Sequence, residues 1–216
     1  MELILVGKHI NFAYNQTPIL NDINVQFEQG KVHAIIGPSG SGKTTLLSVL
    51  SGISKYKEGS IEYKGEELSK LNQSKYRKET GIIFQNFNLI TYLSAVQNIV
   101  VAMDIGSIKG NKLEKAKALL TQVGIKEEDW YRPAAKLSGG QQQRVAIARA
   151  LATDSEIIFA DEPTGNLDSK TGQEIIRLLC NLASEHNKCV ICVTHDMRFR
   201  KKADIVYTLS DGTIDT

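Results

Sequence analysis

A glycine-rich octapeptide between an apolar run and an amphipathic segment constrains this fold more than any other feature. Residues 32–36 are apolar enough for a buried strand, and apolar residues recur at helical spacing after Thr44. Between them stands a complete G-x-x-x-x-G-K-[ST] motif, Gly37-Pro38-Ser39-Gly40-Ser41-Gly42-Lys43-Thr44. Its glycines let backbone N–H groups turn inward, and the helix that follows directs its positive end to the same point. The segment is predicted to hold phosphates, with Lys43 as their cation and Thr44 as a Mg²⁺ ligand.

The composition sets the class of protein. With 216 residues and 42% apolar content the chain can bury the core of one domain, which we expect to span residues 1–216. No apolar run approaches the ~18 residues that cross a bilayer. The net charge of +2 gives no drive toward nucleic acid. The first residues lack a signal-peptide pattern and three cysteines are too few for a disulfide framework, which favours the cytosol.

Short β-type runs alternate with helical patterns along the whole chain, which indicates an α/β domain. Strands are predicted at residues 10–14, 23–27, 32–36, 60–63, 81–84, 157–160, 189–194 and 204–209. Helices are predicted from residues 42–45 onward, at 138–152 and at 171–186. Helical spacing dominates from about residue 93, and residues 93–152 are predicted to form a helical subdomain inserted in the α/β core.

Two carboxylates, Asp161 and Glu162, follow the apolar run 157–160 directly. Ions are costly to desolvate unless they are paired or bound to a metal. Beside a phosphate-binding loop, we interpret Asp161 as part of the Mg²⁺ shell and Glu162 as the base that orients and deprotonates the attacking water. A solvated acidic turn before Pro163 would be the simpler interpretation if the segment stood alone.

Gln85 and His195 follow two further β-type runs in the same manner. In a parallel α/β sheet, ligands bind at the carboxyl ends of the strands. If these strands are parallel neighbours, four strand ends converge on one nucleotide, which is the main argument from the residues for function. Taken singly, Gln85 or His195 would more often be an ordinary loop residue.

A second helix start suited to anions lies at Leu137-Ser138-Gly139-Gly140-Gln141. Ser138 can cap the helix, and the two glycines expose its first N–H groups. The glycine-rich loop at 37–44 is already predicted to bind the phosphates from one side. The second anion site is therefore unexplained within a monomer.

Together these motifs resemble the nucleotide-binding subunit of an ATP-binding cassette (ABC) transporter, in order and spacing, from Tyr14 to His195. The corresponding motifs are the Walker A loop at 37–44, the Q-loop at Gln85, the signature at 137–141, the Walker B end at Asp161 and Glu162, the D-loop at Asn166, Leu167 and Asp168, and the switch histidine at His195. The sequence of residues 161–168 is similar to that found in the branch of ABC ATPases that includes the lipoprotein-releasing, macrolide-exporting and cell-division members.

The resemblance implies a P-loop NTPase core with a mostly parallel sheet, an N-terminal antiparallel β subdomain and an inserted helical subdomain. It implies an ATP hydrolase that uses ATP and Mg²⁺, with Tyr14 stacking on adenine unless that side chain is only packing. The implied nucleotide-binding residues are Tyr14, Gly37, Pro38, Ser39, Gly40, Ser41, Gly42, Lys43, Thr44 and Thr45. The implied catalytic residues are Lys43, Gln85, Glu162 and His195, and the implied metal ligands are Thr44, Gln85 and Asp161.

The resemblance also implies that two copies pair head to tail, so that the signature of one chain closes on the ATP held by the other. Transmembrane permease subunits would dock a short helix near Gln85 and hold the chain at the cytoplasmic face of the cell membrane. Two functions stay open: powering transport of a substrate, or signalling mechanically to the membrane partner without transport. An ABC protein acting on DNA or ribosomes is disfavoured because the chain has one cassette and no room for a coiled-coil arm.

A run of basic residues follows His195. We interpret it as a solvated helix face rather than a contact with anionic lipid or a partner. Its members are Arg198, Arg200, Lys201 and Lys202.

Overall fold

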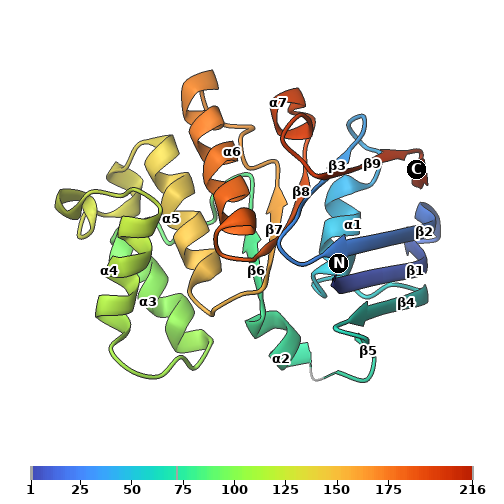
Figure 1. Ribbon diagram of the computed structural model, residues 1–216, viewed down its shortest axis with the longest axis horizontal. Helices are drawn as coiled ribbons and strands as arrows, with labels where there is room; N and C mark the ends of the chain where they lie inside the picture. Colours follow the sequence, from blue (N-terminus) through green and yellow to red (C-terminus); the bar gives the residue numbers. More distant parts are fainter. Residues whose placement is uncertain (1, 72, 216) are drawn as a thin grey trace.

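The computed structural model describes residues 2–71 and 73–215, which form two sheets and the helices that cover them (Figure 1). In chain order the strands and helices are β1 (Leu3–Tyr14), β2 (Thr17–Glu28), β3 (Val32–Ile36), α1 (Lys43–Leu50), β4 (Glu58–Tyr63), β5 (Glu66–Glu67), α2 (Gln73–Lys78), β6 (Thr80–Ile83), α3 (Ala95–Ile105), α4 (Lys112–Gln122), α5 (Gly139–Leu151), β7 (Ile157–Asp161), α6 (Ser169–Ser184), β8 (Cys189–Val193), α7 (Met197–Arg200), β9 (Ile205–Ser210) and β10 (Thr213–Asp215). Two short 3₁₀ helices, Glu127–Asp129 and Ala134–Lys136, lie between α4 and α5.

The larger sheet has the strand order β10-β9-β3-β8-β7-β6. Neighbouring strands from β9 to β6 are parallel, and β10 joins the edge in the antiparallel direction. The register aligns the strand ends, because Ile35 pairs with Val193 and Val193 pairs with Asp161. The segments that follow β3, β6, β7 and β8 therefore all leave the sheet at the carboxyl ends of the strands, as the sequence predicts.

Each face of this sheet carries its own hydrophobic core, because side chains alternate between the faces of a strand. Phe159 and Ile191 point to the face covered by α1 and by the smaller antiparallel sheet, β2-β1-β4-β5. Ile158 and Val190 point to the other face, where α3, α5 and α6 pack. Figure 1 shows α3, α4 and α5 gathered on the side of the molecule away from the antiparallel sheet.

The strands of the antiparallel sheet are longer than predicted. The expected strands 10–14 and 23–27 cover only the C-terminal halves of β1 and β2, which have 12 residues each. The pairing of β1 with β2 shifts register between Gly7 and Ile10. His9 and Asp22 have positive φ angles of 51° and 52°, so the backbone bulges there and breaks the alternation on which sequence recognition of a strand depends.

The elements that the sequence did not reveal are the short ones, β5, α2, α7 and β10, which offer too few residues for a periodic pattern. The longest helix of the described residues is α6, with 16 residues. Across residues 2–71 and 73–215, no helix has both the length and the apolar character that crossing a bilayer requires.

Candidate active site

The loop between β3 and α1 has the geometry of an anion cradle. Gly40 and Gly42 adopt left-handed φ angles of 82° and 100°, which glycine reaches without strain. Gly42 is also the N-cap of α1 and offers no side chain to cover the first N–H groups of the helix. Gly37 is required for another reason, since a Cβ at this position would stand 2.0 Å from the carbonyl oxygen of Leu209. The loop thus leaves backbone donors free at the positive end of a helix.

Lys43 lies inside this loop. Its side chain is buried, and its Nζ donates to the carbonyl oxygens of Gly37 at 3.0 Å and Pro38 at 2.8 Å. A buried ammonium needs such acceptors to offset its desolvation. These contacts place the positive charge at the centre of the cradle.

Thr44 and Asp161 meet across the sheet edge, 117 positions apart in the sequence. The Thr44 hydroxyl donates to Asp161 Oδ1 at 3.1 Å. Burial raises the pKa of Asp161, and the hydrogen bond from Thr44 opposes that rise. A hydroxyl beside a half-buried carboxylate is the oxygen donor set that Mg²⁺ accepts.

The catalytic pair predicted from two strand ends is also in contact. Glu162 Oε1 lies 2.9 Å from Nδ1 of His195. The other carboxylate oxygen accepts from the Thr194 hydroxyl at 3.0 Å and from the backbone N–H of His195 at 3.3 Å. The His195 ring is 73% exposed, whereas Glu162 is 15% exposed. The carboxylate is therefore fixed, while the imidazole faces the open side of the site.

Gln85 stands apart from the Thr44 and Asp161 pair. Within residues 2–71 and 73–215 its side chain has no hydrogen bond to either, and its Nε2 lies 3.1 Å from where a Cβ on Gly165 would stand. The backbone carbonyl oxygen of Gln85 accepts a hydrogen bond from the side-chain amide of Asn166 at 3.0 Å. The structure thus brings Gln85 to the segment after Glu162 rather than to the candidate metal ligands.

The segment from Asn166 to Ser169 leads into α6. Asp168 is the N-cap of that helix and accepts from the backbone N–H groups of Lys170 and Thr171, both at 3.0 Å. A hydrogen bond from the Thr171 side chain, and then these backbone hydrogen bonds, lower the pKa of Asp168. Leu167 is half-buried against the start of α5, where a Cβ on Gly139 would lie 3.6 Å from it.

The predicted signature caps α5 as expected. Ser138 is the N-cap, its hydroxyl accepts from Gln141 N at 3.3 Å, and Gln141 Oε1 accepts from Ser138 N at 2.9 Å. This reciprocal arrangement is a capping box. Gln141 also donates to Asp129 at 2.7 Å, which ties the cap to the preceding segment. Leu137 is buried, while Ser138 is exposed and Gly139 and Gly140 are half-buried.

The helices that carry the two anion sites lie on opposite faces of the core sheet. Leu46 of α1 packs in the core that includes Phe159, whereas Val145 of α5 packs in the core that includes Ile158. Figure 1 shows α1 and α5 on different sides of β7 and β8. The P-loop and the signature of one chain therefore do not share a face.

Three site contacts escaped the sequence interpretation. Gln143, fully buried in α5, donates from Nε2 to the carbonyl oxygen of Pro163 at 2.8 Å. Thr194 holds Glu162, and Thr164 donates to Asp196 at 2.9 Å. For Thr194 a signal existed, since it is a polar residue at the end of an apolar strand, like His195.

Tyr14 ends β1 as predicted, is 53% exposed and packs edge-on against Phe12.

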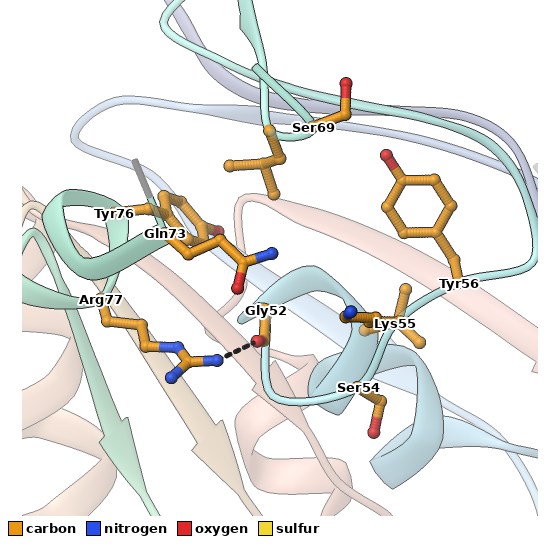
Figure 2. A pocket seen from close by; sticks show the side chains of 10 residues that line it. Gly52, Ser54, Lys55, Tyr56, Ser69, Gln73, Tyr76 and Arg77 are labelled. Atoms are coloured by element: carbon orange, nitrogen blue, oxygen red, sulfur yellow. Dashed lines mark hydrogen bonds between the residues drawn. The ribbon is translucent and has the colours of Figure 1, made fainter. Parts of the chain in front are cut away.

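A cavity of about 270 Å³ lies at the far end of α1, away from the P-loop, and Figure 2 shows the residues that line it. Two of its polar side chains are hydrogen-bonded to the backbone, since Tyr76 OH donates to Leu50 O at 2.6 Å and Arg77 Nη2 donates to Gly52 O at 3.2 Å. None of the predicted site residues lines it. These contacts support the C-terminal end of α1, whereas the P-loop lies at the other end of that helix.

Comparison with known families settles the class of protein. The family described as ABC transporter matches residues 20–165, more than half of the chain. The chain belongs to the ABC transporter family. It is an ATP-binding subunit that powers an ABC transporter, and it is an ABC-type ATPase that hydrolyses ATP to ADP and phosphate.

Three similar proteins refine this placement within the ABC family. YclH of Bacillus subtilis (strain 168), an uncharacterized ABC transporter ATP-binding protein, is 47% identical over 198 residues, 91% of this chain and 88% of YclH. MacB of Bartonella henselae, a macrolide export ATP-binding/permease protein, is 41% identical over 91% of this chain, which spans 30% of MacB. The ATP-binding cassette MJ0796, solved as a post-hydrolysis dimer bound to ADP and Pi, is 33% identical with a TM-score of 0.89 over 99% of this chain and 97% of that one. The predicted family, branch and fold are confirmed.

Proposed function

We propose that the P-loop, Asp161, Glu162 and His195 form one ATP-hydrolysing site, which residues 137–141 of a second copy complete. The supporting observation is the convergence of separate strand ends. Thr44 reaches Asp161 at 3.1 Å and Glu162 reaches His195 at 2.9 Å, with Lys43 held in the adjacent loop. Carboxylate, hydroxyl, ammonium and imidazole groups at one sheet edge suit phosphoryl transfer to water.

The P-loop binds the phosphates. Lys43 exchanges its contacts with the carbonyls of Gly37 and Pro38 for phosphate oxygens, and the free N–H groups at the start of α1 donate to the same anion. Thr45 lies in the first turn of α1 with Thr44, and its backbone N–H is among the groups proposed to face the phosphates. The exposed ring of Tyr14 offers a surface for the adenine base.

Thr44 and Asp161 fit a Mg²⁺ ion because both present oxygen donors, 3.1 Å apart, at the same edge. No group of three or more His, Cys, Asp or Glu side chains suited to a metal occurs in the described part of the chain. A pair of protein oxygens is the usual protein share of a Mg²⁺ site that is shared with substrate phosphates. When bound, the ion neutralises charge on the phosphoryl oxygens. Gln85, whose side chain lies against Gly165 in this structure, is proposed as a third ligand only once that side chain turns toward Asp161.

Glu162 acts as the general base. It accepts a proton from the attacking water at a carboxylate oxygen, and the water oxygen bonds to the terminal phosphorus as the bond from that phosphorus to the bridging oxygen breaks, so that ADP and phosphate leave. Thr194 and the backbone of His195 hold one carboxylate oxygen, and the other, which lies against the exposed His195 ring, faces the side from which the water would approach. His195 positions Glu162 and faces the developing charge with its exposed edge.

A second copy supplies the missing side of the site. The Ser138 end of α5 lies on the opposite sheet face from α1, so we propose that it serves the ATP of the partner copy in a head-to-tail homodimer. The D-loop residues 166–168 lie between the two sites in this arrangement. The dimeric MJ0796 cassette supports the proposal.

A transmembrane permease subunit is the proposed partner for the groove beside Gln85, and nucleic acid is not. A cavity of about 570 Å³ lies between β6 and the ends of α3 and α5, where Ile105 is 77% exposed beside Arg77 and Arg149. MacB, whose name joins ATP-binding and permease functions, supports the pairing.

We propose that residues 93–152 form the helical subdomain of a single domain, 1–216, at the cytoplasmic face of the membrane.

Phosphate release by the purified chain tests this proposal. We expect hydrolysis that depends on Mg²⁺, and we expect Asp161→Asn to shift the Mg²⁺ requirement upward by about tenfold, the scale of one lost charged contact. Asp154→Asn is the matched control, since Asp154 is exposed and has a positive φ of 56° that Asn tolerates equally well. Equal Mg²⁺ dependence in the parent and in Asp161→Asn would contradict the assignment.

A further inference from the structure

Arg198, assigned from the sequence to a solvated helix face, is engaged in the structure. It lies on α7, three residues after His195, and its side chain is 34% exposed. Its Nη1 donates to the carbonyl oxygen of Ser169 at 2.7 Å and to the Ser169 hydroxyl at 2.9 Å. Figure 1 places α7 beside the start of α6, where Ser169 lies. The other members of the run, Arg200, Lys201 and Lys202, are exposed, as predicted.

The rest of the guanidinium holds Asp196. Nε donates to Asp196 Oδ1 at 3.0 Å and to Oδ2 at 3.1 Å, and Nη2 donates to Oδ2 at 2.7 Å. These hydrogen bonds lower the pKa of Asp196 to about 2, so its carboxylate stays ionised. A planar fork that spans a carboxylate and a backbone carbonyl has a geometry that lysine does not reproduce.

Asp196 connects this fork to the candidate catalytic residues. Its Oδ2 accepts from the Thr164 hydroxyl at 2.9 Å, and its N–H donates to the Thr194 hydroxyl at 3.0 Å. The same Thr194 hydroxyl donates to Glu162 at 3.0 Å. Asp196 thus joins the residues on either side of His195 to the turn that follows Glu162.

The segment between Glu162 and α6 is therefore held at both ends by one ion pair. Thr164 at its start binds Asp196, and Ser169 at its end binds Arg198. Gly172 makes room for the fork, since a Cβ on it would stand 2.9 Å from Nη2 of Arg198. We infer that Arg198 is a positioning residue, which fixes the loop 163–168 relative to Glu162 and His195. The inference rests on the proposed function, in which this loop lies between the two ATP sites.

Arg198→Ala tests the inference in the full-length chain. We expect kcat for ATP hydrolysis to fall about ten- to hundredfold, the scale of a small misplacement of catalytic groups. The Kd for ATP stays within about twofold, because the hydrogen bonds of Arg198 go to Ser169 and Asp196 and not to the P-loop. Arg198→Lys, which keeps the charge but not the fork, recovers part of the loss. Arg200→Ala is the matched control on the same helix and keeps the parent rate.

Gly172→Ala separates positioning from stability. Alanine favours the helix over glycine, so a purely structural effect keeps or raises the melting temperature and leaves kcat unchanged. Displacement of the flexible Arg198 fork instead lowers kcat while the melting temperature holds. Parent-like kcat in both Arg198→Ala and Gly172→Ala would overturn the inference, as would a loss of kcat in Arg198→Ala matched by an equal loss of ATP affinity. A parent chain without ATPase activity would count against the proposed function instead.

Discussion

Glu162 Oε1 and His195 Nδ1 lie 2.9 Å apart although 33 positions separate the two residues. Glu162 has a positive φ of 45°, which a non-glycine residue adopts at a cost. Its N–H donates to Val193 O at 2.9 Å, so both its backbone and its side chain are anchored to the end of β8. The strained backbone aims the carboxylate at the exposed histidine.

Glu162→Gln removes the general base and keeps the shape of the side chain. We expect phosphate release to slow by roughly 10²–10⁴-fold, with ATP affinity retained. Light scattering with excess MgATP checks the second consequence, a trapped ATP-bound dimer. Glu185→Gln, an exposed change at the end of α6, is the control. A variant that stays monomeric with MgATP would count against the two-copy site.

Lys43→Ala removes the cation from the cradle. A hydrogen bond to a charged group contributes about 1.5–3 kcal/mol, so ATP affinity falls roughly ten- to hundredfold. Isothermal titration calorimetry measures this change in the Kd for ATP. Lys57→Ala, an exposed lysine outside the P-loop, should bind as the parent does. Unchanged affinity in Lys43→Ala would show that the phosphates lie elsewhere.

Mixing two inactive variants tests the head-to-tail pairing. Ser138→Arg blocks the signature and Lys43→Ala disables the P-loop, and each alone should lose hydrolysis. In an equal mixture, heterodimers keep one intact P-loop facing one intact signature, so roughly a quarter of the parent rate returns. No recovery, with dimers present by scattering, would argue for a different pairing.

His33 makes stability depend on pH. Burial lowers the pKa of this fully buried ring from 6.5 to about 4, and its Nε2 accepts from the Glu28 N–H at 2.9 Å. Because the folded pKa is below the unfolded one, the unfolded chain takes up the proton first. Stability is full above pH 6.5 and falls as the pH drops toward 4, by up to about 3 kcal/mol.

Urea unfolding at several pH values checks this expectation. The difference in unfolding free energy between the parent and His33→Gln should shrink steadily from pH 7 to pH 4, since glutamine does not titrate. His186→Gln, a change at an exposed histidine, is the control. A difference that stays constant over this range would assign the acid sensitivity to other groups.

The sheet edge was predictable because its information is local. Each of β3, β6, β7 and β8 contains a short apolar run, which leads into the glycine-rich loop or into a polar residue, and the parallel order follows from the α/β alternation. The motifs at 37–44 and 137–141 are likewise contiguous. Sequence was therefore sufficient for the core strands and for the candidate residues that follow them.

What escaped prediction depends on partners distant in sequence. Arg198 reads as one charge in a basic run, and its partner Ser169 lies 29 positions away. Gln143 reads as part of a glutamine run, yet it holds Pro163 from another element. The extensions of β1 and β2 depend on backbone bulges at His9 and Asp22, which no periodicity reveals.

The most direct test is a crystal structure of Glu162→Gln with MgATP. The account predicts two copies with two nucleotides between them, each with its terminal phosphate near Lys43, residue 162 and His195 of one chain and Ser138 of the other. A nucleotide whose terminal phosphate lies far from residue 162 and His195, or one that meets no residue of the second copy, would contradict it.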